Sequence, residues 1–233
     1  LGWLEANAAA GRVGGEIVPT AGWTVASFRH LTSRALDPFP HHHNVVANTV
    51  TLPDGTRRAL DSRSLYRHTQ AASALATAEM RHLLSSRFGV RWRPGRKSGW
   101  EIDGIDDSVL REFSQRRTEI DDALRELEEE IGRGAHPGEI ERIVLRTRPA
   151  KQHTPVAELV DDWRRRAAAL GFDERAIAAC HGHAIDLAEP DPEALFSSLA
   201  GPDGICEGGS VFSRADAVVA LANHPVPAES EPQ

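Results

Sequence analysis

Features that mark several common protein classes are missing from this sequence of 233 residues. Its two cysteines, Cys180 and Cys206, are too few for a disulfide framework, and no stretch resembles a secretory signal. No apolar run approaches the roughly 18 residues of a membrane span. We therefore expect a cytoplasmic protein that makes no membrane contact. The first residue is leucine instead of methionine, so we also expect a piece of a longer protein.

Motifs for several familiar chemistries are missing as well. There is no GxxxxGK[ST] phosphate loop, so nucleotide hydrolysis is not expected. There is also no Gly-rich dinucleotide pattern and no Ser-His-Asp arrangement. The cluster of Cys180, His181 and His183, with Cys206 later, matches no strong zinc-binding spacing. We expect that cluster to be an ordinary helix end.

Charge is distributed unevenly, although the net charge is only −7. Residues 57–97 hold ten basic and two acidic side chains, whereas residues 101–130 hold four basic and twelve acidic ones. The acidic segment is expected to be a solvated face. The basic segment is equally consistent with a solvated face and with a surface that contacts phosphates.

Four of the eleven histidines lie in residues 28–48, which read FRHLTSRALDPFPHHHNVVAN. Side chains two apart on an extended backbone share a face, so His41 and His43 should point together and His42 away. His30 is eleven residues before His41, which is enough for a strand to return beside its neighbour. Three neutral imidazoles suit a divalent metal, and three protein ligands that leave one coordination position open are typical of a catalytic site rather than a structural one. The residues alone are also consistent with the alternative that these are ordinary surface or core histidines that bind no metal.

Periodicity and turn residues predict a chain of mixed secondary structure. We expect short strands at residues 16–18, 23–29 and 43–52, a turn at 31–40 between the last two, and a hairpin at 90–105. Helices are expected at residues 1–11, 69–88, 106–131, 140–145, 155–170, 175–180 and 212–222. The glycines and proline of residues 132–138 mark the clearest linker.

The histidine stretch also resembles a known signature. The pattern F-R-H-x-T-S-R-x-x-D-P is met by Phe28, Arg29, His30, Thr32, Ser33, Arg34, Asp37 and Pro38, and is followed by His41, His43 and Val-Ala-Asn. It resembles the metal-binding signature of TrwC/TraI-type relaxases, the MobF family, which nick plasmid DNA at an origin of transfer. Further similarity runs through DGTRRALDSRSLYRH, FSQRRTEI, LRTRPAK and ELVDDW, to about residue 172.

The resemblance implies an α+β fold. Its palm-like antiparallel sheet would carry the three-histidine (HUH) site on central strands, with helices covering one face. We expect the domain to be N-terminally truncated and followed by a smaller helical region. Residues 1–138 would be the metal-binding core, residues 139–223 a helical C-terminal part that leads into a helicase-like region, and residues 224–233 a disordered tail.

The resemblance also implies the site and its partners. His30, His41 and His43 would hold a divalent metal ion such as Mg²⁺ or Mn²⁺. His42, Pro40 and Asn44 depart from the family pattern without removing a ligand, although His42 is a competing ligand. Single-stranded DNA at an origin of transfer would be the substrate, and other relaxosome proteins would be partners. We expect DNA contacts from Arg34, Arg57, Arg58, Arg63 and Arg67, and base stacking on Trp92 or Trp100.

Relaxases of this family attack DNA with a tyrosine near the N-terminus, and an acidic residue from that part supports a histidine ligand. The single tyrosine here, Tyr66, matches the Leu-Tyr of the family's middle segment and is expected to pack. We therefore assign no catalytic residue in this chain and expect it to be inactive alone. The alternatives are a degenerate or truncated remnant that binds metal and DNA without catalysis, and an accessory protein that uses its histidines for stability.

Overall fold

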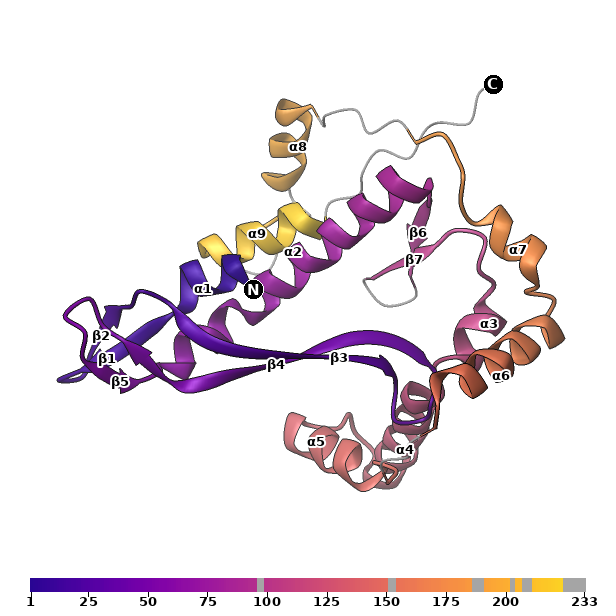
Figure 1. Ribbon diagram of the computed structural model, residues 1–233, viewed down its shortest axis with the longest axis horizontal. Coiled ribbons are helices and arrows are strands. Elements are labelled where there is room, and N and C mark those ends of the chain that lie inside the picture. The colour runs from indigo at the N-terminus through magenta and orange to yellow at the C-terminus, as the bar shows by residue number, and fades with distance from the viewer. Residues whose placement is uncertain (96–98, 151–153, 186–190, 202–203, 207–210, 224–233) are drawn as a thin grey trace. The chain divides into compact units, whose positions relative to one another are not determined.

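The computed structural model describes residues 1–95, 99–150, 154–185, 191–201, 204–206 and 211–223 (Figure 1). Helices and antiparallel strands confirm the predicted α+β class. The chain divides into two compact units. The first unit is formed by Leu1–Ala26, Asn44–Trp92 and Gly182–Gln233, and the second by Ser27–His43 and Arg93–His181. Among the described residues no helix is both long and apolar enough to cross a membrane.

The first unit is built around the long helix α2 (Ser62–Phe88). Asp61 caps its start by accepting the Arg63 N–H, and Gly89 ends it with φ 63°, a backbone conformation that glycine adopts without strain. Helices α1 (Gly2–Ala8) and α9 (Arg214–Asn223) pack along α2 (Figure 1). The buried apolar side chains of this unit are mostly small, and small side chains let helices approach closely. They include Ala8, Ala10, Ala71, Ala74 and Ala222.

Three expectations for this unit are wrong, and one of its helices was not expected. Residues 10–13 form a strand, β1 (Ala10–Val13), which pairs with β2 (Glu16–Pro19), where a helix to residue 11 was expected. Helix α2 begins at Ser62 instead of residue 69, because Asp61 supplies a cap that the periodicity does not show. Tyr66 therefore lies in the second turn of α2, and it is 75% exposed instead of packed. A further helix, α8 (Pro192–Leu199), was not expected at all.

The second unit contains most of the remaining helices. The helix expected over residues 106–131 is broken at Phe113 and Ser114 into α3 (Asp107–Glu112) and α4 (Gln115–Ile131). Asp106 caps the start of α3, since its carboxylate accepts the Ser108 N–H. Helices α5 (Pro137–Arg146), α6 (Val156–Ala169) and α7 (Glu174–Ala179) confirm the three expected next, and α5 lies beside α4 (Figure 1). The hairpin predicted at 90–105 is present as β6 (Trp92–Pro94) and β7 (Trp100–Ile102).

A hairpin of two long strands carries the histidines. β3 (Trp23–Thr32) and β4 (Pro38–Thr51) are neighbours in one sheet, and β5 (Arg57–Ala59) pairs with the far end of β4. The turn between β3 and β4 is shorter than predicted and takes only residues 33–37. The domain limits at 138, 139 and 223 stay predictions. The tail at residues 224–233 lies outside the described residues.

Candidate metal centre

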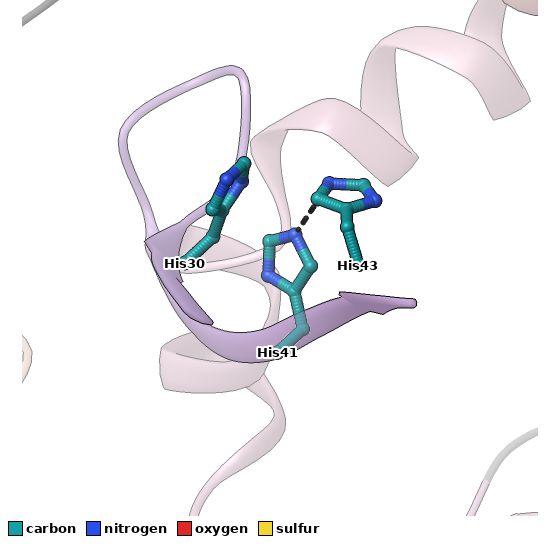
Figure 2. Close-up of side chains that lie close together, drawn as sticks. All are labelled: His30, His41 and His43. Carbon is teal, nitrogen blue, oxygen red and sulfur yellow. Dashed lines mark hydrogen bonds between the residues drawn. The ribbon is translucent and has the colours of Figure 1, made fainter. Parts of the chain in front are cut away.

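Three histidines converge at the turn end of the β3–β4 hairpin. His30 comes from β3 and His41 and His43 from β4, and Figure 2 shows their rings turned toward one another. The ring centroids are 5.3 Å apart for His30 and His41, 4.6 Å for His30 and His43, and 4.9 Å for His41 and His43. One nitrogen from each ring lies within 4.8 Å of the others. The predicted alternation and strand return therefore bring these side chains together.

The backbone sets the tautomer of His41. Its Nδ1–H donates to the carbonyl oxygen of Phe39 at 2.7 Å, since a carbonyl can only accept. With this tautomer a neutral ring presents the lone pair of Nε2 toward the other histidines, and that nitrogen lies 3.3 Å from Nε2 of His43 (Figure 2). Metal-binding histidines are commonly oriented by this kind of contact through their other ring nitrogen.

The donor set fits a divalent cation. Within the described part of the chain, these histidines are the one group of three or more His, Cys, Asp or Glu side chains spaced to hold a metal. Three imidazoles without a carboxylate suit a borderline cation better than a hard one such as Mg²⁺. His42 is exposed and is not a member of the group, so the structure does not place it as a competing ligand.

The triad opens on a hollow of about 330 Å³. Three arginines line it with the histidines: Arg34, Arg116 and Arg148. Only Arg34 was expected to contact DNA. Arg116 and Arg148 were missed, although they lie in the segments FSQRRTEI and LRTRPAK that carry the family resemblance. That similarity was the one signal in the sequence that could have found them.

Two of these arginines are held by backbone carbonyls. Arg116 of α4 donates to the carbonyl oxygens of Val144 at 2.7 Å and Thr147 at 2.5 Å, which belong to the end of α5. These contacts satisfy carbonyls that a helix end leaves without partners. Arg34 donates to the carbonyl oxygen of Pro149 at 3.3 Å. The positive charge beside the triad is therefore positioned by the chain from residue 144 to 149.

Asp37 anchors the turn that joins the two histidine strands. Its side chain is buried, and its oxygens accept the Gln115 N–H at 3.0 Å, the Gln115 side-chain amide at 3.1 Å and the Arg166 guanidinium at 3.3 Å. The preceding residue, Leu36, has φ 64°, an uncommon conformation for leucine. Its carbonyl oxygen accepts the Trp163 indole N–H at 2.8 Å. Helices α4 and α6 thus hold the turn in place.

Burial and their mutual hydrogen bond change the pKa values of both Asp37 and Arg166. Burial raises the pKa of Asp37, and the hydrogen bonds from Arg166 and from the Gln115 N–H only partly offset it. For Arg166, burial alone would lower the pKa, but hydrogen bonds to Glu112 and Asp37 outweigh it and the pKa is raised. Because the groups bonded to the Asp37 oxygens all donate, the geometry favours the ionised carboxylate paired with the arginine.

The other predicted DNA contacts lie in the first unit and do not line the hollow. Arg57 and Arg58 are on β5, and Arg63 and Arg67 are on α2, and all four are exposed. Of the two tryptophans considered for stacking, Trp92 donates its indole N–H to Ser85 at 3.0 Å. Trp92 and Trp100 are both half-buried, and neither lines the hollow.

An α+β fold with three converging histidines on a strand hairpin defines the class of three-histidine relaxase domains. The family model named TrwC relaxase matches residues 1–170. The chain therefore belongs to the TrwC relaxase family.

Two relatives from Escherichia coli carry the name multifunctional conjugation protein TraI. The protein of strain K12 is 27% identical over an alignment of 197 residues, and the match covers 81% of this chain and 10% of the relative. The other is 29% identical over 199 residues, with the same two shares. The chain thus spans about a tenth of the length of these relatives.

Solved structures of the conjugative relaxase TrwC are also similar. The metal-free complex with oriT DNA is 28% identical with a TM-score of 0.64, covering 73% of this chain and 61% of that one. The copper-bound complex with oriT DNA has 28% identity and a TM-score of 0.63, covering 73% and 59%. A TrwC complex with a 27-mer DNA comprising the recognition hairpin and the cleavage site has 28% identity and a TM-score of 0.63, covering 73% and 61%.

Proposed function

We propose that this chain is the metal- and DNA-binding part of a conjugative relaxase. Its reaction is metal-assisted transesterification at a phosphodiester of single-stranded DNA at an origin of transfer. The observation that carries the proposal is the convergence of His30, His41 and His43 beside three arginines in one hollow. The conjugation proteins and oriT complexes among its relatives support the same substrate.

The residues have distinct parts in this proposal. His30, His41 and His43 would hold the cation, and the Phe39 carbonyl, which accepts from Nδ1 of His41, would leave Nε2 of that ring free to bind. Arg34, Arg116 and Arg148 attract the phosphates of the strand and fix it in the hollow. When bound, a divalent cation supplies Lewis-acid stabilisation of charge on the non-bridging phosphate oxygens. The donor set favours Zn²⁺ or Co²⁺ over Mg²⁺ in binding strength.

A nucleophile is the remaining requirement, and we propose that it is not Tyr66. That residue matches the family's middle segment, and it belongs to α2 of the first unit. An origin-of-transfer oligonucleotide incubated with the chain and Mn²⁺ should give DNA binding without a covalent adduct. A denaturing gel checks this, with Tyr66→Phe as the comparison. A covalent band that disappears in Tyr66→Phe would show that the chain carries its own nucleophile.

Metal binding tests the triad directly. Co²⁺ titrated into the chain should give one binding site by calorimetry. His43→Ala should abolish it or weaken it by more than the roughly 10- to 100-fold that the loss of a supporting residue costs. His42→Ala is the matched control, because His42 neighbours two ligands without belonging to the group. Equal affinities for His43→Ala and the unmodified chain would rule out the proposed ligand set.

A further inference from the structure

One large aromatic side chain at the hollow has no role in the proposal above. Phe39 lies between the turn and the first β4 histidine, and it lines the hollow together with the triad. Its ring centroid is 4.8 Å from that of His41 with an interplanar angle of 37°. Even so, the residue is 55% exposed. Part of the aromatic surface is therefore open to a ligand.

Folding gains little free energy from burying this ring. A phenylalanine gains most of its free energy of burial only when it leaves water, and this one retains more than half of its exposure. The exposed ring thus contributes little to the core and much to the surface of the site.

The surroundings indicate which ligand suits it. Arg34, Arg116 and Arg148 provide positive charge for a phosphate backbone, and Phe39 provides an apolar aromatic face in the same hollow. Phosphate contacts with stacking on an aromatic ring are how proteins bind single strands without reading their sequence. In a duplex the bases are already stacked on one another and offer no free face.

We propose that Phe39 is a stacking platform for one unpaired base, next to the phosphate held at the triad. This inference rests on the proposed single-stranded DNA function and adds a subsite to it. The subsite binds any nucleobase through its flat face and needs no hydrogen bonds to the base edge. It takes the place that Trp92 or Trp100 was expected to fill.

Two labelled oligonucleotides of equal charge separate stacking from phosphate binding. One is a thymidine single strand of about 20 nucleotides, and the other is an abasic strand with the same number of phosphates. Affinities of the full chain are measured by fluorescence anisotropy at constant salt in EDTA. Phe39→Ala should weaken binding of the thymidine strand by roughly 5- to 150-fold and leave the abasic strand unchanged. Phe39→Leu should also weaken it, whereas Phe39→Trp should preserve it.

A phenylalanine outside the hollow serves as the control. Phe196→Ala removes a phenylalanine that is 62% exposed and does not line the hollow, so it should bind both strands as the unmodified chain does. Unchanged thymidine binding in Phe39→Ala, or equal losses for both strands, would overturn the subsite while leaving the DNA function standing. If the unmodified chain binds neither strand, the proposed function and the subsite fail together.

Discussion

At the scale of single residues, Asp37 connects the packing of the second unit to the candidate site. It is 1% exposed, four residues before His41, and its partners Gln115 and Arg166 come from two different helices. A charged side chain is stable at such a depth only when its hydrogen bonds are satisfied. The position of the histidine strands therefore depends on a contact made far from them in sequence.

Asp37→Ala should lower the free energy of unfolding by about 3 kcal/mol, because Arg166 and the Gln115 N–H lose a buried acceptor. It should also weaken Co²⁺ binding, since the turn between the ligand strands loses its anchor. Urea denaturation and calorimetry measure the two effects. Asp122→Ala is the control: Asp122 forms an exposed pair with Arg125, so its loss should change stability little. An Asp37→Ala variant as stable as this control would disprove the anchor.

At the scale of elements, α5 shows how a helix can position an arginine in the site. The carbonyls at its C-terminal end hold Arg116 of the hollow. Its N-terminus is closed by a capping box, in which His136 accepts the Gly138 N–H and Glu139 accepts the His136 N–H at 3.0 Å. Arg133 adds two hydrogen bonds of 2.9 Å to the Glu139 carboxylate. Both ends of this helix are thus fixed by specific polar contacts.

The pH dependence of stability should reveal this cap. The hydrogen bond from Arg133, with that from the His136 N–H, lowers the pKa of Glu139 from 4.5 to about 2. Because the folded-state pKa is depressed, the stabilisation is fully present above pH 4.5 and is lost as the pH falls toward 2. Glu139→Gln should therefore melt at a lower temperature than the unmodified chain at pH 6, and the difference should vanish near pH 2. Circular dichroism measures both melting temperatures as a function of pH. A difference in melting temperature that does not depend on pH would contradict the proposed role of the Glu139 carboxylate.

At the scale of the whole molecule, the chain forms two units that each combine segments far apart in sequence. In the first unit, Arg81 of α2 is 6% exposed and donates to the Ala222 carbonyl oxygen of α9 at 2.7 Å. The triad and every residue that lines its hollow belong to the second unit. Stability in the first unit and metal binding in the second are therefore expected to respond to different substitutions.

Arg81→Met keeps most of the apolar stem and removes the charged donor. It should lower the free energy of unfolding by about 1–3 kcal/mol, because the buried Ala222 carbonyl loses its partner. Co²⁺ affinity measured below the unfolding transition should stay unchanged. Arg87→Met, an exposed arginine of the same helix, is the control and should change neither quantity. A loss of metal affinity in Arg81→Met would show that the units are coupled.

Local patterns in the sequence determined several features of this protein. Alternation along a strand places His41 and His43 on one face, and a turn signal between two strands returns His30 beside them. The helix end predicted at residue 88 and the helix start predicted at residue 106 also agree with the structure, where Gly89 ends α2 and Asp106 caps α3. These features depend on residues near one another in the chain, so short-range rules are sufficient to predict them.

Only the tertiary structure decided the rest. Arg116 and Arg148 reach the hollow, Arg166 reaches Asp37, and the helix predicted over residues 106–131 breaks where the Gln115 N–H is taken by Asp37. The exposure of Phe39 and Tyr66 likewise depends on which elements pack nearby. Each of these outcomes rests on contacts between residues far apart in sequence. Hydrophobic periodicity carries no record of such pairings, because they form only when the chain closes on itself.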